Sequence, residues 1–247
     1  MKSKRLATAG LLGGVLMLGA AVLGISGGQN PPAPNTSASA DDQGTFATFF
    51  AGHPLGTEKF NIRSSAGEIA AEAEIEMKVQ QGGQTVHLKS RPRLVLTSQF
   101  EPQTYAVNQE GSQPFHLEVD FRASPAVSRL RLASSKQDDH RDFVLNKDVL
   151  ILDDNVVHHY QLLVDRFALK PEKKQTFNAY IPQEAVPGVL EVEEVGPEDV
   201  EFAGRHETLR HLVVTTDLAR IDLWVDGQQH LQRVHNLASQ IEAVRTK

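Results

Sequence analysis

The amino-acid sequence predicts a mainly β protein, an antiparallel meander curled as a half-barrel or open barrel around a single central α-helix at about residues 153–168. Three observations support this fold class. Several segments alternate apolar and polar residues, a Gly-Gly pair separates two of them, and one segment midway along the chain has helical spacing instead. A sheet with one apolar face must cover that face, and one amphipathic helix can do so. A closed barrel or a sandwich would also cover it.

The clearest pair of strands lies at residues 69–79 and 85–90, joined by a turn at Gly82 and Gly83. In the first of them, apolar residues from Ile69 to Val79 alternate with Glu and Lys residues. This pattern predicts a hairpin with one wet and one dry face. The same alternation recurs at residues 115–122, 129–132, 176–181 and 221–226. One-sided strands of this kind are typical of antiparallel sheets.

The segment at residues 153–167 departs from the strand pattern. Asp153 or Asp154 suits the N-cap of a helix, and Lys170-Pro171 is expected to end it. Four apolar residues follow the cap at helical spacing and should pack against the sheet: Val156, Tyr160, Leu163 and Phe167.

Residues 1–28 are expected to form a signal peptide or an N-terminal membrane anchor. Three cations precede the uncharged apolar run 6–25, and this order is typical of export across a bacterial-type inner membrane. The run is about as long as a membrane span but rich in Gly and Ala, so cleavage and retention both stay open. We therefore expect a periplasmic protein, either soluble or tethered to the inner membrane by residues 6–25.

Two further ranges complete the expected organisation. Residues 29–44 are rich in Pro, Ser, Ala and Asn and should form a disordered linker. Residues 45–247 should form a single antiparallel β domain, because the strand-like alternation continues through them without a compositional break.

Composition and charge exclude several classes of function. The chain has no cysteine, which excludes disulfides, thiolate metal sites and the lipid-modified cysteine of bacterial lipoproteins. The net charge is −6, and it becomes −9 without Lys2, Lys4 and Arg5. A domain this acidic is a poor partner for nucleic acid or for an anionic membrane surface. No cofactor is expected.

Neither the histidines nor the acidic clusters form a recognisable catalytic or metal-binding motif. His158 and His159 are adjacent on the predicted helix, so their side chains point in different directions and cannot hold one metal ion together. One ring is expected to be partly buried and the other exposed. His206 and His211 are five residues apart in a strand-like region, which is the wrong spacing for a zinc-protease helix. The polar run 138–142 is expected to be a solvated turn. We expect no catalytic residue and no metal ligand.

Trp224 is unusual because it lies on the polar face of its strand. It is expected either to belong to an outer contact patch or to be shielded by neighbouring long side chains.

Three stretches resemble an uncharacterised family of secreted bacterial domains built as a half-barrel around one helix. They are HPLGTEKFNI at residues 53–62, LDDNVVHHYQLLVDRF at 152–167 and ARIDLWVDGQQHLQRV at 219–234. That fold is similar to the periplasmic lipoprotein carriers and implies an apolar concave surface able to hold acyl chains. The sequence departs from those carriers in lacking a lipid-modified cysteine and in carrying the pair His158-His159.

The expected function follows from this fold. We expect an exported, non-catalytic module that binds a lipid or another hydrophobic small molecule in a cavity of the half-barrel. The alternative is a membrane-tethered structural or protein-interaction scaffold with a fully packed core, and a hydrolase is the third possibility. Ten residues are candidates for the concave lining: Phe60, Ile62, Phe115, Leu117, Val119, Phe121, Leu130, Leu132, Phe177 and Leu223.

Overall fold

The structure is a computed structural model that describes residues 41–246 except 82, 112–113, 133–138 and 203. The expected signal or anchor at residues 1–28 and most of the expected linker therefore lie outside the described residues. The first strand begins at Asp42, so the last part of the range 29–44 belongs to the sheet. Within the described residues, no helix is both long and apolar enough to cross a membrane.

The described residues form one sheet of fifteen strands and one α-helix, which confirms the predicted fold class. The strands are β1 Asp42–Phe50, β2 His53–Ser65, β3 Glu68–Gln81, β4 Gln84–Thr97, β5 Pro102–Glu110, β6 Phe115–Asp120, β7 Ala126–Leu132, β8 Asp139–Phe143, β9 Leu150–Ile151, β10 Lys174–Ile181, β11 Val186–Phe202, β12 Arg205–Thr215, β13 Arg220–Val225, β14 Leu231–Asn236 and β15 Ile241–Arg245. The helix α1 is His158–Phe167.

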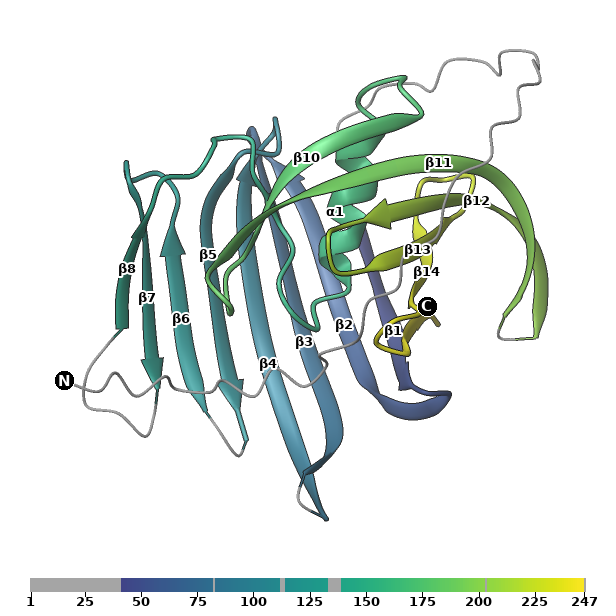
Figure 1. The fold of residues 1–247 in the computed structure, drawn as a ribbon, viewed down its shortest axis with the longest axis horizontal. Helices are drawn as coiled ribbons and strands as arrows, with labels where there is room; N and C mark the ends of the chain where they lie inside the picture. The colour runs from purple at the N-terminus through teal and green to yellow at the C-terminus, as the bar shows by residue number, and fades with distance from the viewer. Residues whose placement is uncertain (1–40, 82, 112–113, 133–138, 203, 247) are drawn as a thin grey trace.

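The sheet is a nearly continuous antiparallel meander. Its spatial order runs from β8 down to β1, continues through β15, and then descends from β14 to β9. The first and last strands of the chain are therefore neighbours in the middle of the sheet, where Phe46 pairs with Arg245. The edge strands β8 and β9 do not pair with each other, so the sheet curls without closing (Figure 1).

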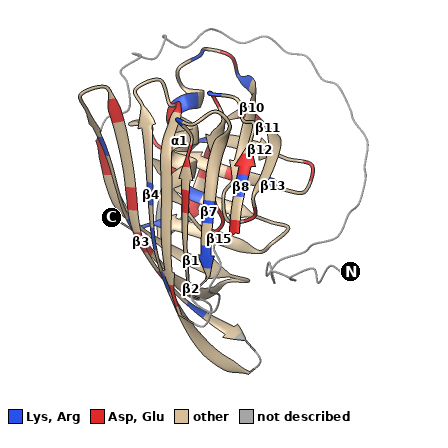
Figure 2. Cartoon of the chain, turned by 90° about the vertical axis from the view of Figure 1, so that its left-hand side faces the viewer, with Lys and Arg blue, Asp and Glu red and all other residues tan. Residues whose placement is uncertain are grey.

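The side-chain alternation read from the sequence is present in the strands. In β3, Ile69, Ala71 and Ile75 are buried, while the glutamates between them face solvent. Those glutamates pair with cations of β4, and one such pair joins Glu72 to Arg93. Basic and acidic residues are both spread over the strands, and neither kind is gathered in one patch (Figure 2). The polar run 138–142 was expected to be a solvated turn. Residues 139–142 are exposed as expected, but they belong to β8 and pair with β7 instead of forming a turn, and residue 138 lies outside the described residues.

The helix lies between the β1–β5 part and the β10–β13 part of the sheet (Figure 1). It is shorter than expected and begins at His158, so Asp153 and Asp154 are not its caps. Val157 occupies the cap position without a side-chain hydrogen bond. The buried faces of the helix and of both parts of the sheet form one cluster, which we call the inner core. The apolar face of the sheet is thus covered by a segment of the same chain.

Candidate functional site

The candidate lining residues face the interior, where most of them are packed against other parts of the chain. Six of the ten belong to the inner core and are almost fully buried: Phe60, Ile62, Leu117, Val119, Phe177 and Leu223. Phe115, Phe121 and Leu130 are partly buried and pack against that core. Leu132 is also partly buried, at the end of β7. Their role in binding a ligand stays a prediction.

The helix contributes its own apolar residues to the same core. Leu163 and Phe167 are buried in it, and Tyr160 packs against it with part of its side chain exposed. Val156 is buried just before the helix begins. Leu162 and Val164 are also in the core. The helix therefore buries a wider face than the four predicted positions alone would cover.

A carboxylate from a distant strand caps the start of the helix. Glu58 on β2 is fully buried and accepts hydrogen bonds from the backbone N–H groups of Val157 and His158, both at 2.7 Å. The Nδ1 atom of His158 also lies 2.9 Å from Glu58 Oε1. Because an ionised carboxylate only accepts hydrogen bonds, that nitrogen carries the proton. Glu58 thus satisfies two free N–H groups and places negative charge at the positive end of the helix.

A second group of buried polar side chains surrounds Asp153. Its carboxylate accepts hydrogen bonds from the Tyr105 hydroxyl and from the side chain and backbone N–H of Gln183. The Asp153 backbone N–H donates to Nδ1 of His159 at 3.1 Å, which places the proton of a neutral His159 on Nε2. These bonds tie β5 and the segment after β10 to the chain just before the helix.

Burial determines the acid–base behaviour of this group. Desolvation, and then the neighbouring His158, hold the pKa of His159 well below its usual value. Burial, and then the charge of Asp153, raise the pKa of Tyr105 well above its usual value. Burial also raises the pKa of Asp153, although its hydrogen bonds oppose this effect. All three pKa shifts follow from burial in the core. The shifts of His159 and Tyr105 keep these two side chains uncharged near neutral pH.

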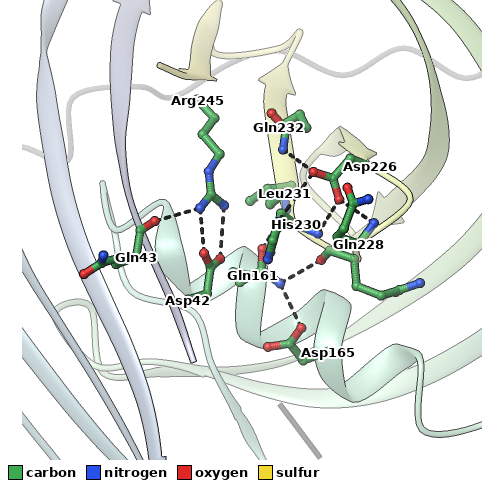
Figure 3. A network of polar contacts seen from close by, with 11 residues as sticks. Asp42, Gln43, Gln161, Asp165, Asp226, Gln228, His230, Leu231, Gln232 and Arg245 are labelled. Carbon is green, nitrogen blue, oxygen red and sulfur yellow. Dashed lines mark hydrogen bonds and ion pairs between the residues drawn. The ribbon is translucent and has the colours of Figure 1, made fainter. Parts of the chain in front are cut away.

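Gln161 connects the middle of the helix to the β13–β14 turn (Figure 3). Its side-chain oxygen accepts from the Leu231 N–H at 2.6 Å, and its nitrogen donates to the Gln229 carbonyl at 3.0 Å. The same view shows the bidentate pair of Arg245 with Asp42, which links the first and last strands (Figure 3). The helix is therefore fixed to both parts of the sheet by polar contacts as well as by packing.

A small hollow lies beside the helix in the described part of the chain. This hollow between β4, β9 and the helix has a volume of about 10 Å³, about what one water molecule needs. Pockets for small molecules usually measure about 300–1,000 Å³. The hollow is lined by Leu94, Leu96, Phe100, Val149, Leu150, Ile151 and Leu162.

The buried polar residues do not form a metal site. Among the residues that the structure describes, no group of three or more His, Asp and Glu side chains could hold a metal ion. His158 and His159 are both fully buried, which corrects the expectation that one ring would be exposed. Their carboxylate and backbone contacts fix the helix, so this arrangement positions a structural element.

Trp224 lies in a second, smaller cluster on the outer side of the sheet. We call this group the outer cluster; its buried members are Val200, Leu209, Trp224 and Val244, and Phe49 packs against it. The indole is 6% exposed, stacks on His211 and lies under the guanidinium of Arg233. The expectation that neighbouring long side chains shield Trp224 is therefore confirmed.

Sequence reasoning missed Glu58 and Gln161 as the residues that position the helix. A signal was present for Glu58, since it shares the buried face of β2 with Phe60 and Ile62. A carboxylate in an otherwise apolar row is expected to have a buried partner. For Gln161, the sequence gave no comparable signal, because its partners are backbone groups of the distant residues 229 and 231.

Comparison with solved structures shows where this fold occurs. The chain is similar to a β-barrel-like protein of the domain of unknown function DUF1849 from Brucella abortus, with a TM-score of 0.56, 9% sequence identity, and coverage of 83% of this chain and 95% of that one. This likeness shows a shared β-barrel-like fold. A DUF1089 family protein from Pseudomonas aeruginosa matches at a TM-score of 0.44 with 11% identity over 70% of this chain and 86% of that one. No family model matches the sequence, and no curated protein matches it.

Proposed function

We propose that this chain is an exported, non-catalytic scaffold whose interior is filled by its own helix and whose outer surface contacts another protein. The observation that carries this proposal is the inner core. Leu163, Leu212 and Leu223 are fully buried in one cluster that joins the helix to the sheet. A lipid carrier of this shape needs an open concave face, whereas here the candidate lining packs against α1 and its neighbours.

Exposed apolar side chains on the turns support a contact with a partner. Leu218 is 90% exposed in the β12–β13 turn and Leu237 is 69% exposed in the β14–β15 turn. Phe50 is 41% exposed where β1 ends, and the backbone N–H of Ala51 donates to the carbonyl of Gln240, so two of these turns are in direct contact. Large apolar side chains on successive turns favour a contact with a partner over free exposure to water.

Photocrosslinking from these turns tests the partner contact. Benzoylphenylalanine is placed at Leu218 or Leu237 in the full chain, produced in a host that exports it. The matched control is Ala66, an exposed residue in the β2–β3 turn at the opposite end of the strands. We expect a discrete protein adduct from positions 218 and 237 and none from position 66. Absence of an adduct from both turns, or equal labelling from all three positions, contradicts the scaffold.

Native mass spectrometry separates the scaffold from the rival function, binding of a lipid or another hydrophobic ligand. The full chain is purified from the same host, and bound material is extracted into organic solvent. We expect the mass of the polypeptide alone. A stoichiometric phospholipid or fatty acid that stays bound through purification would establish the carrier function and require the helix to move. The mature N-terminus, read in the same experiment, shows whether residues 1–28 are removed.

A further inference from the structure

The β11–β12 hairpin extends beyond the strand that supports it. β12 pairs with β13 only from Arg210 to Thr215, so the described residues of 198–209 pair only with each other. In Figure 1 this part of the hairpin curves away past β13 and β14. We call it the distal arm. A two-stranded hairpin alone is at best marginally stable, so the arm depends on what holds it to the rest of the sheet.

The arm is held by the outer cluster. Val200 and Leu209 from the arm are buried against Trp224 and Val244. Glu198, at the base of the arm, accepts a hydrogen bond from the indole N–H of Trp224 at 3.0 Å through Oε2. The same oxygen lies 2.9 Å from Nδ1 of His211. One carboxylate therefore connects the arm to both aromatic rings.

His211 bridges two carboxylates. Its Nδ1 faces Glu198 on β11, and its Nε2 lies 2.8 Å from Asp222 Oδ1 on β13. Ionised carboxylates offer only acceptors, so both contacts are hydrogen bonds only when both ring nitrogens carry protons. A neutral imidazole has a single N–H and must give up one of the two bonds. The side chain of His211 is 12% exposed, so water reaches the ring poorly, whereas Glu198 is 44% exposed and can turn toward water once the bond is lost.

The other charged groups around the ring are on the same outer face. Arg220 donates to Asp222 at 3.0 Å, which leaves Asp222 paired when His211 is neutral. Arg233 on β14 lies over Trp224 and donates to Glu242 on β15. The Glu198 carboxylate is bonded to His211 and to the indole N–H of Trp224. Deprotonation of His211 therefore weakens the Glu198 side of the bridge.

We propose that His211 is a pH-dependent clasp: its protonated ring holds the distal arm over Trp224, and its deprotonation releases the arm and uncovers the outer cluster. This inference does not depend on the proposed function. The geometry that carries it is the Glu198–His211–Asp222 bridge across three neighbouring strands, together with the dependence of the arm on the outer cluster. Histidine is the side chain whose charge changes near physiological pH.

Fluorescence tests the clasp directly, because Trp224 is the only tryptophan in the chain. The full chain is titrated from about pH 5 to about pH 9, a range that spans the usual titration of histidine. We expect one step in which Trp224 emission shifts to the red and acrylamide quenching increases as the pH rises. Far-UV circular dichroism should stay unchanged across the step. In His211→Gln the step should be absent, and in Glu198→Gln it should be smaller, because the charged partner of the ring is lost.

Three outcomes overturn the clasp. They are a wild-type chain without a step, a step that persists in His211→Gln, and a change in emission without any change in acrylamide quenching. The last outcome would mean that His211 titrates while the arm stays in place. If either variant fails to fold, hydrogen exchange on the wild-type chain decides the question. Arm amides, compared at both pH values after correction for intrinsic exchange, must lose protection at the higher pH relative to amides of β3.

Discussion

The inner core and the outer cluster bury aromatic and aliphatic side chains in different ways. The inner core encloses the helix, and its polar residues Glu58, His158 and His159 are fully buried. The outer cluster is small, and its polar residues are partly wet, with Glu198 44% exposed. Desolvation penalises an unpaired polar group far more inside than at the surface. The inner contacts should therefore control whether the chain folds, and the outer ones how firmly one hairpin is held.

The largest effect is expected from a charge placed in the inner core. Leu163 is fully buried on the helix, so Leu163→Asp puts an unpaired carboxylate in the core and should abolish cooperative folding. Thermal melting followed by circular dichroism is the measurement. Leu169→Asp, at a residue that follows the helix and is 39% exposed, is the matched control and should melt nearly as the wild type does. An unchanged melting temperature in Leu163→Asp would show that the helix does not fill the sheet.

Removing the carboxylate that caps the helix should have the next largest effect. Glu58→Ala leaves the N–H groups of Val157 and His158 and the His158 ring without their buried partner. We expect a loss of about 3–5 kcal/mol in the free energy of unfolding, as for other broken buried pairs. Denaturant titration measures this loss. Glu72→Ala removes a carboxylate whose side chain is 52% exposed and should cost less than about 1 kcal/mol. Equal losses in the two variants would contradict a special role for Glu58.

The periodicity of the sequence was sufficient to predict the sheet and the position of the helix. Alternation at residues 69–79 and 221–226 identified β3 and β13, because side-chain direction repeats every two residues in a strand. Short or charged strands escaped this reasoning. β8 carries Asp139, His140 and Asp142 at an edge of the sheet, where no apolar face is required.

The contacts that position the helix could not be predicted in the same way. Glu58 caps a helix that begins 100 residues later, and Gln161 contacts a strand 70 residues further on. Local pattern favoured Asp153 or Asp154 as the cap. In the structure Glu58 takes this role, and Asp153 holds Tyr105 and Gln183 instead. Periodicity reports which side of an element is buried, whereas these pairings depend on how distant elements meet.

Acid should destabilise the inner core through His159. Its folded-state pKa is held well below the ordinary value of 6.5 by burial, so below about pH 6.5 the unfolded chain binds a proton that the folded chain refuses. The contribution of the neutral His159 ring to the free energy of unfolding is thus fully present above about pH 6.5. Below that pH it falls by about 1.4 kcal/mol per pH unit.

Denaturant titrations from pH 7 to pH 5 measure this slope. Burial raises the pKa of Asp153, and it raises the pKa of Asp154 to about 7, so both carboxyls add stability as the pH falls and oppose His159. The readout is therefore the difference in slope between His159→Leu and the wild type, which should be about 1.4 kcal/mol per pH unit. The variant also lowers stability at pH 7, because the backbone N–H of Asp153 loses its acceptor. His140→Leu is the control, since His140 is exposed on β8. The slope should be unaffected there, and a slope that His159→Leu leaves intact would assign the acid sensitivity to another group.

The smallest effect, and the sharpest contrast between the two clusters, is expected from salt. Glu198→Gln removes one partly exposed charge beside His211 and should cost about 1 kcal/mol or less at low ionic strength. Salt weakens ion pairs at the surface, whereas buried pairs are screened much less. In denaturant titrations at low and at high salt, the loss caused by Glu198→Gln should therefore shrink, while the loss caused by Glu58→Ala should persist. If the loss of stability caused by Glu198→Gln does not depend on salt, the outer cluster excludes water as fully as the inner core does. The partial exposure of Glu198 would then not explain why its contacts are weak.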